Sequence, residues 1–287
     1  MAKRWAVAGV GIPAVLGLLY LGGWPLAVPV AALAALAARE VYQLSAEGGV
    51  AALEGLGAAG AAGLVLLAAW RPTFAAFAPA ALALVGALTV VALVAAMAVR
   101  WPGGKPLGAV AVTLFGCVYA GLSIACVPLL HALPEARGWT DPASGAWGGL
   151  LLVALPLAAT WLGDALALFV GTAWGKGGLA PTISPNKSWI GVWAGLAGAG
   201  LAGVVWYYVA RGFLPGLPVE GPAVAVAVGT LLGVGAILGD LAESLLKREA
   251  GVKDSGAFFP GHGGVLDRLD ALVFTLPAAY VALVALD

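Results

Sequence analysis

Long apolar segments, separated by short breaks, decide most of what this chain can fold into. A helix that crosses a bilayer needs about 20 apolar residues, because its backbone polar groups must be satisfied within the segment. Glycine, proline and charged residues fill the breaks, as is usual for loops. The sequence therefore predicts an all-α, polytopic integral membrane protein with about nine transmembrane helices, at residues 5–22, 25–44, 51–70, 74–99, 107–130, 147–172, 188–210, 221–241 and 266–286.

Composition supports a membrane protein. Hydrophobic residues make up 62% of the chain and charged residues 10%, whereas soluble domains carry about 25% charged residues. The formal net charge is zero, so the overall charge gives no indication of a nucleic-acid partner, and none is expected. We expect one membrane domain over residues 1–287, in which the spans of 1–140 form a scaffold and those of 141–287 carry the active site.

The basic residues are distributed unevenly between the two sides that nine spans define. Positively charged loops usually face the cytoplasm. One side holds only Arg71, Arg137 and Arg211. This asymmetry predicts a cytoplasmic N-terminus and an external C-terminus, since the other side holds Lys3, Arg4, Arg39, Arg100, Lys105, Lys176, Lys187, Lys247, Arg248, Lys253 and Arg268.

A polar stretch over residues 240–270 interrupts this apolar chain near its C-terminus. Charged side chains cost roughly 2.5–3.5 kcal/mol each at the centre of a membrane helix, so such a dense group favours a functional site on the cytoplasmic side. Asp240, Glu243, Ser244 and Lys247 follow the spacing i, i+3, i+4, i+7 and share one helix face, with Arg248 at its edge. The alternative is a solvated helix end, which would not confine polarity to one face.

The loop that follows combines charged residues with glycines. Lys253 and Asp254 precede His262, Gly263 and Gly264. Glycines let backbone amides approach a phosphate closely, and the next helix begins directly after them, with free amides of its own. We expect this loop to contact a phosphate-bearing ligand; the alternatives are an ordinary glycine turn and an ordinary loop histidine.

Asp267 and Asp270 lie three residues apart at the start of the last predicted helix, on either side of Arg268. Paired carboxylates beside phosphate-binding groups suit Mg²⁺, a hard cation that takes oxygen ligands and bridges phosphates. The sequence therefore predicts a magnesium site formed by Asp267 and Asp270. The alternative is that acids merely stabilise the first turn of a helix.

A second polar region lies at residues 161–191. Asp164 stands alone in an apolar run, and a carboxylate within the membrane is a functional candidate, although it can also serve a helix–helix hydrogen bond. Lys176, Ser184 and Lys187 follow in a polar loop on the same side as residues 240–270, so we expect the two regions to converge on one polyphosphate. Arg39 and Glu40 lie at the end of the second predicted span; we expect both to be interfacial and give them little functional weight.

These residues resemble the signature of the phosphatidate cytidylyltransferases, or CDP-diacylglycerol synthases. The resemblance covers the C-terminal half, whereas the N-terminal half matches only as hydrophobic spans. It departs at Thr172, where relatives often carry arginine, and at Ile190, where they usually carry an acid. The matching residues include Asp164, Lys176, Ser184, Lys187, Ser244, Lys247, Arg248, Lys253, Asp254, Gly256, Phe259, Pro260, His262, Gly263, Gly264, Asp267, Arg268 and Asp270.

The resemblance implies a Mg²⁺-dependent nucleotidyltransferase that converts CTP and phosphatidic acid into CDP-diacylglycerol and pyrophosphate in phospholipid biosynthesis. It implies a bacterial-type inner membrane location and a homodimer. It further implies Asp240 as a third Mg²⁺ ligand beside Asp267 and Asp270, with two divalent ions, or one with a monovalent cation, both open. It also implies catalytic roles for Asp267, Asp270, Lys247, Arg248, Lys253, Arg268 and His262, and substrate binding by Ser244, Asp254, Gly263, Gly264, Asp164, Lys176, Ser184 and Lys187. The alternatives are a membrane enzyme using CTP on another lipid, such as a polyprenol kinase or an archaeal-type lipid cytidylyltransferase, and a transporter.

Overall fold

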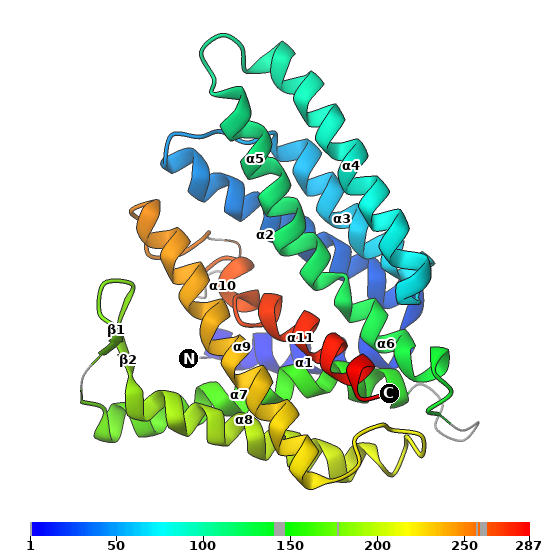
Figure 1. Ribbon diagram of the computed structural model, residues 1–287. Helices are drawn as coiled ribbons and strands as arrows, with labels where there is room; N and C mark the ends of the chain where they lie inside the picture. Colours follow the sequence, from blue (N-terminus) through cyan, green and yellow to red (C-terminus); the bar gives the residue numbers. More distant parts are fainter. Residues whose placement is uncertain (1, 141–146, 177, 257, 259–262) are drawn as a thin grey trace.

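The computed structural model describes residues 2–140, 147–176, 178–256, 258 and 263–287. Helices dominate these residues (Figure 1). In chain order the elements are α1 (Ala2–Leu21), α2 (Gly23–Glu47), α3 (Glu54–Trp70), α4 (Phe74–Val99), α5 (Pro106–Gly116), the π-helical turn η1 (Cys117–Leu122), α6 (Cys126–Ala136), α7 (Trp147–Trp174), β1 (Gly178–Ala180), β2 (Ser184–Ser188), α8 (Trp189–Ala210), α9 (Pro222–Glu249), α10 (Leu266–Leu269) and α11 (Leu272–Ala285).

The all-α, polytopic prediction is confirmed. Within the described residues, seven helical segments are long and apolar enough to cross a membrane. Two of them are composite: α5, η1 and α6 form one segment over Pro106–Ala136, and α10 and α11 form another over Leu266–Ala285. α3 is apolar but has only 17 residues. The protein is therefore a multi-pass membrane protein built around helices.

A short β-hairpin was not predicted. β1 and β2 pair antiparallel, with Gly178 opposite Ser188 and Ala180 opposite Ser184. The strands are three and five residues long, too short for an alternating pattern to reveal them in a polar loop. At the end of β2 the Ser188 hydroxyl accepts a hydrogen bond from the Gly191 amide (3.3 Å) and caps α8. The hairpin thus leads directly from α7 into α8.

Small residues allow the C-terminal helices to pack closely. α7 and α8 run side by side, and α9 crosses α8 (Figure 1). A Cβ atom added at Gly203 would lie 2.2 Å from the carbonyl oxygen of Ala225, and one at Gly229 would lie 2.3 Å from that of Ala199. Glycines at both positions therefore set the separation of α8 and α9, as is common for helices packed in lipid.

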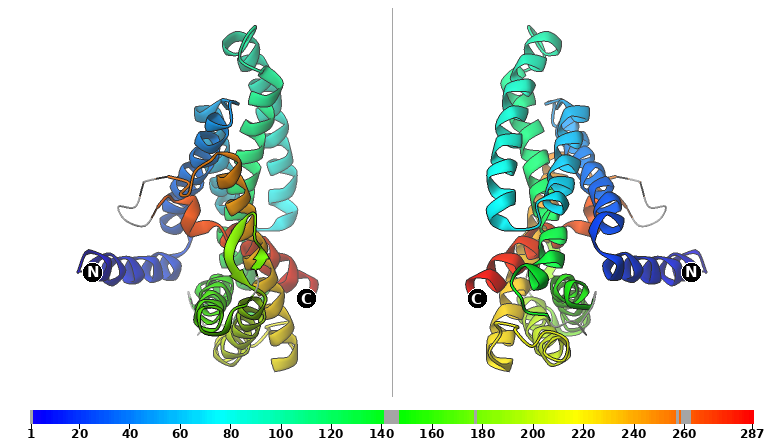
Figure 2. Two further views of the ribbon diagram at one scale, coloured as in Figure 1. Left: turned by 90° about the vertical axis from the view of Figure 1, so that its left-hand side faces the viewer. Right: turned by 90° about the vertical axis from the view of Figure 1, so that its right-hand side faces the viewer.

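The N-terminal helices form a second group around α2. Tyr42 is fully buried and its hydroxyl donates a hydrogen bond to the carbonyl oxygen of Thr113 in α5 (2.9 Å). α1 projects sideways from the other helices (Figure 2), and Leu19 near its C-terminal end is buried. α2 also contacts α10, so the N-terminal group reaches the region that carries the predicted site.

Candidate active site

Three carboxylates from two helical segments converge at the centre of the site. Asp240 and Glu243 come from α9, and Asp270 lies between α10 and α11; one oxygen of each lies within 4.8 Å of the others. The approach depends on Gly239, where an added Cβ would lie 2.4 Å from the carbonyl oxygen of Asp270. We call Asp240, Glu243 and Asp270 the acidic cluster. Two of its members were predicted as metal ligands, and Glu243 was not.

Glu243 makes the acidic cluster suitable for a cation. Its side chain is only 1% exposed, and among the described residues neither carboxylate oxygen receives a well-directed hydrogen bond. Lys247, one turn further along α9, places its Nζ 2.5 Å from Oε2 of Glu243, which balances charge but leaves lone pairs free. A buried carboxylate with free lone pairs beside two further carboxylates is a donor set that fits Mg²⁺.

Asp267 lies beside the acidic cluster but has other partners. Its Oδ1 is 2.7 Å from Lys247 Nζ, and its Oδ2 accepts hydrogen bonds from the amides of Ser255 (3.0 Å) and Gly264 (2.8 Å). Lys247 therefore joins Asp267 to Glu243. Metal binding by Asp267 remains a prediction, because its oxygens are engaged with these groups.

The two polar regions of the sequence meet at Asp240. Lys187 at the end of the hairpin places its Nζ 2.6 Å from Asp240 Oδ2, and the Ser244 hydroxyl donates a hydrogen bond to Asp240 Oδ1 (3.4 Å). Asp164 on α7 interacts electrostatically with both Asp240 and Lys187. The hairpin thus brings a lysine to the acidic cluster, whereas convergence of the two regions on one polyphosphate stays a prediction.

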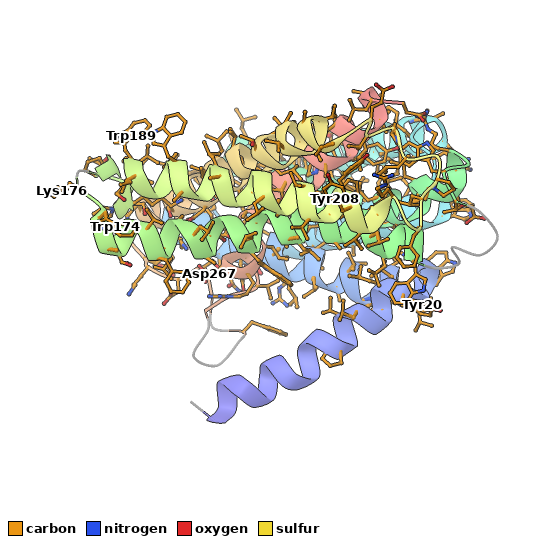
Figure 3. The ribbon with its side chains drawn as sticks, turned by 90° about the horizontal axis from the view of Figure 1, so that it is seen from below. Tyr20, Trp174, Lys176, Trp189, Tyr208 and Asp267 are labelled. Carbon is orange, nitrogen blue, oxygen red and sulfur yellow. The ribbon has the colours of Figure 1, made fainter. Side chains whose placement is uncertain are left out.

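The other predicted cations are exposed. Arg248 is exposed and its Nε donates a hydrogen bond to the carbonyl oxygen of Ile183 (3.2 Å), which ties α9 to the hairpin. Lys253 and Arg268 are exposed. Lys176 is exposed too and lies with Trp174 and Trp189 at one end of the α7–α8 pair (Figure 3). Exposed tryptophans are typical of a membrane–water interface.

The remaining predicted residues occupy several environments. Asp254 is exposed and Ser184 in β2 is half-buried. Gly263 has a φ of 79°, a left-handed conformation that favours glycine, and the next amide, that of Gly264, donates to Asp267. The predicted ligand contact of His262 lies outside the described residues.

The two departures from the signature lie before and after the hairpin in the sequence. The Thr172 hydroxyl on α7 donates to the carbonyl oxygen of Leu168 in the preceding turn (2.7 Å), and Ile190 on α8 is 40% exposed. Neither residue belongs to the acidic cluster. The departures therefore leave its carboxylates unchanged.

The expectation that Glu40 is interfacial is wrong. Glu40 is 6% exposed, and its carboxylate accepts hydrogen bonds from the Ser255 hydroxyl and from the amides of Val265 and Leu266. The error has a physical cause: a carboxylate near the end of a membrane helix is usually solvated, whereas here tertiary contacts of α2 with Ser255 and with the start of α10 supply buried donors. Position along the helix alone could not show this contact.

Tyr119 on η1 was also missed. Its hydroxyl is buried and has no hydrogen-bond partner among the described residues. The carboxylates of Glu243 and Asp270 lie close enough to interact with it electrostatically. In the sequence it stands in an ordinary apolar run. The spacing of Glu243 from Asp240, in contrast, was a usable signal, because both lie on the same helix face.

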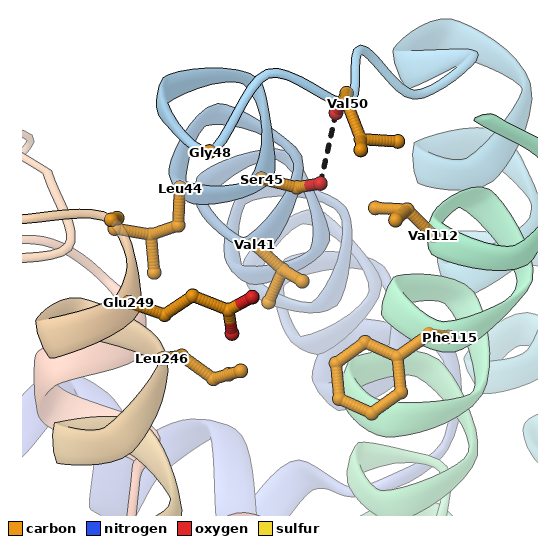
Figure 4. Close-up of a pocket in the computed structure, with 10 residues that line it drawn as sticks. Val41, Leu44, Ser45, Gly48, Val50, Val112, Phe115, Leu246 and Glu249 are labelled. Carbon is orange, nitrogen blue, oxygen red and sulfur yellow. Dashed lines mark hydrogen bonds between the residues drawn. The ribbon is translucent and has the colours of Figure 1, made fainter. Parts of the chain in front are cut away.

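A separate groove lies on another side of α9, between α2 and α5 (Figure 4). Val41, Val112, Phe115 and Leu246 contribute apolar surface, and the Glu249 carboxylate points into it. None of the predicted site residues that the structure describes lines this groove. It is therefore distinct from the acidic cluster.

Comparison with known proteins identifies the family of this chain. The cytidylyltransferase family model matches residues 2–286. A phosphatidate cytidylyltransferase of Synechocystis is 33% identical over 301 aligned positions, which cover 99% of this chain and 97% of the relative. Phosphatidate cytidylyltransferase 5 of Arabidopsis thaliana, a chloroplast protein, is 32% identical to this chain. The alignment covers 97% of this chain and 71% of the relative.

A shorter match reaches higher identity. The phosphatidate cytidylyltransferase of Haemophilus influenzae is 42% identical over 129 residues, which are 45% of this chain and 44% of the relative. The long matches span both the N-terminal helices and the polar C-terminal region. This chain therefore belongs to the cytidylyltransferase family.

Proposed function

We propose that this protein transfers the cytidylyl group of CTP to phosphatidic acid and forms CDP-diacylglycerol and pyrophosphate. The observation that carries the proposal is the convergence of Asp240, Glu243 and Asp270 beside Lys187 and Lys247. The near full-length similarity to proteins named phosphatidate cytidylyltransferase supports the choice of substrates.

The acidic cluster would hold the magnesium ion that such a reaction uses. Asp240, Glu243 and Asp270 supply the oxygen donors, and Asp267 is the further predicted ligand on the other side of Lys247. A bound Mg²⁺ would neutralise phosphate charge and polarise the phosphoryl oxygens. The proposal leaves the number of bound ions open: a second divalent ion or a monovalent cation could accompany this Mg²⁺.

The reaction depends more on positioning the two phosphates than on proton transfer. A phosphate oxygen of phosphatidic acid forms a bond to the α-phosphorus of CTP, and the bond from that phosphorus to the bridging oxygen of the β-phosphate breaks, which releases pyrophosphate. The lipid phosphate is already an anion near neutral pH, so the chain need not supply a general base. The main obstacle is repulsion between anions, which cationic side chains reduce.

The proposal assigns that task to the cationic side chains. Lys187 stands at the acidic cluster, Arg248 ties α9 to the hairpin, and Lys253 and Arg268 are exposed on the loop and on α10. In the proposal they bind the phosphates of CTP and of the lipid, with Lys176, Ser184, Asp164, Ser244, Asp254, His262, Gly263 and Gly264 as further substrate contacts. Lys247 holds Glu243 and Asp267 at fixed positions.

The membrane arrangement follows from the substrates. Phosphatidic acid would enter laterally with its acyl chains in lipid, while CTP would arrive from the cytoplasm. We therefore place the N-terminus and the acidic cluster on the cytoplasmic side of a bacterial-type inner membrane, with the C-terminus outside. The proposal includes a homodimer, which chemical cross-linking in native membranes would test.

The direct test is product formation by purified protein in detergent–lipid micelles that contain phosphatidic acid, CTP and Mg²⁺, followed by mass spectrometry. CDP-diacylglycerol should form with the wild type and be lost in Asp267→Asn while the protein remains folded. Polyprenol and archaeal-type ether lipid acceptors would be offered in parallel. Product on one of those acceptors, with none on phosphatidic acid, would replace the proposed substrate.

A further inference from the structure

Glu40 on α2 has an unusually complete set of buried donors. Its Oε2 accepts hydrogen bonds from the Ser255 hydroxyl (2.9 Å) and the Leu266 amide (2.7 Å), and its Oε1 accepts one from the Val265 amide (2.8 Å). These groups lie more than 200 positions away in the sequence. Within the described parts of the chain no lysine or arginine forms an ion pair with Glu40, so neutral donors alone satisfy its carboxylate.

The chain around the carboxylate leaves room for it. A Cβ atom added at Gly256 would lie 2.6 Å from Glu40 Oε1, and one added at Gly264 would lie 2.4 Å from Oε2. Both glycines border the segment that leads to α10. The space for Glu40 is therefore a property of the same loop that carries the proposed substrate contacts.

Ser255 continues the connection from Glu40 to the active site. Its hydroxyl donates to Glu40 and also accepts a hydrogen bond from the Asp267 amide (3.3 Å). Its own amide donates to Asp267 Oδ2 (3.0 Å). Asp267 in turn contacts Lys247, which contacts Glu243 of the acidic cluster. A continuous series of polar contacts thus runs from α2 to the carboxylates.

Packing alone does not account for Glu40. A buried carboxylate is costly to desolvate, and an apolar side chain of similar volume is often as stable or more stable. What an apolar residue cannot do is fix two successive amides and a hydroxyl in one orientation. Residues that orient the groups around a metal site typically change affinity or activity by about 10–100-fold when they are replaced.

We propose that Glu40 is a positioning residue for the active site: its buried carboxylate holds Ser255 and the start of α10, and through Ser255 it sets the place of Asp267. α2, which belongs to the N-terminal half, therefore takes part in building the site. The kinetic part of this inference rests on the proposed function.

The test compares full-length Glu40→Gln with Glu47→Gln, a matched change at an exposed position of the same helix. Two readouts are measured in lipid nanodiscs: amide hydrogen exchange in peptides that contain Val265 and Leu266, and kcat for CDP-diacylglycerol formation. Glu40→Gln should exchange faster in these peptides while α7 and α8 keep their protection, and its kcat should fall about 10–100-fold. Glu47→Gln should match the wild type in both.

Ser255→Ala is the second variant, and it tests the positioning role of Glu40 if Glu40→Gln does not fold. It should lower kcat in the same direction, and the double variant should lose little more than the worse single variant, because both act on one series of contacts. Folded Ser255→Ala with wild-type kcat and exchange would overturn the proposal.

Two further outcomes separate the possible failures. Faster exchange throughout the protein, with a loss of activity that equals the unfolded fraction, would make Glu40 merely structural and overturn the positioning role. A wild-type protein that forms no CDP-diacylglycerol would overturn the proposed function instead, and the exchange comparison would still decide whether Glu40 holds this segment.

Discussion

The ammonium group of Lys247 on α9 lies 2.7 Å from the carboxylate of Asp267 on α10, although the two residues are 20 positions apart in the sequence. The same ammonium lies 2.5 Å from Glu243. One lysine therefore balances two poorly exposed carboxylates and holds the acidic cluster against α10, which carries Asp267.

Replacing Lys247 by methionine should destabilise the protein as well as inactivate it. Breaking a buried ion pair from one side leaves uncompensated charge and typically costs about 3–5 kcal/mol. Thermal unfolding in detergent would measure the change. Lys253→Met, at an exposed position, should change stability by no more than about 0.5 kcal/mol. Equal melting temperatures for the two variants would contradict the bridging role of Lys247.

Adding one methyl group at Gly239 should separate α9 from Asp270. The new Cβ would lie 2.4 Å from a backbone oxygen, which cannot move without shifting the helix. We expect Gly239→Ala to lower kcat at least about tenfold, since displacements near 1 Å cost about that much or more. Gly86→Ala, where a Cβ meets open space, should leave kcat unchanged. Wild-type turnover by Gly239→Ala would show that this close approach is dispensable.

Lys187→Ala should weaken CTP binding with little effect on folding. The ion pair with Asp240 is partly exposed, and such pairs contribute about 0–1 kcal/mol to stability. Steady-state kinetics should show a rise in KM for CTP of about tenfold, which corresponds to one lost charge-assisted contact. Lys176→Ala should have a smaller effect, because Lys176 is exposed. A larger rise in KM for CTP in Lys176→Ala than in Lys187→Ala would indicate that the nucleotide binds away from the acidic cluster.

The proposed orientation predicts which loops react with a membrane-impermeant maleimide. Both native cysteines, Cys117 and Cys126, are free and buried, so alanine at both positions gives a suitable background. A cysteine at position 211 should be labelled on intact cells, and one at position 253 only after lysis. The reverse pattern would place the acidic cluster on the outer face.

Local sequence patterns predicted most of the helices because each membrane helix must satisfy its own backbone. The ends were less certain: the polar face from Asp240 onward continues α9 to Glu249, although the apolar signal stops earlier. The hairpin was missed, since its strands pair within a polar loop and carry no repeating apolar face.

The candidate site was predictable where its residues are close in sequence. Asp240, Lys247 and Asp270 stand in one polar stretch, and the spacing of Glu243 was available on the same helix face. Glu40 and Tyr119 were not accessible in this way, because only packing of the N-terminal helices against α9 and α10 brings them to the site. Long-range contacts of this kind leave no local pattern.

The most direct test of the acidic cluster is the rate of CDP-diacylglycerol formation at increasing Mg²⁺ concentrations, for Glu243→Gln beside Glu249→Gln. Glu249 is exposed on the same helix and points into the separate groove. Glu243→Gln should reduce the maximal rate by about 100-fold or more and need more Mg²⁺ for half-maximal rate, since a metal ligand supplies several kcal/mol of charge stabilisation. Glu249→Gln should behave as the wild type. A Glu243→Gln protein with wild-type rate and Mg²⁺ dependence would contradict the account.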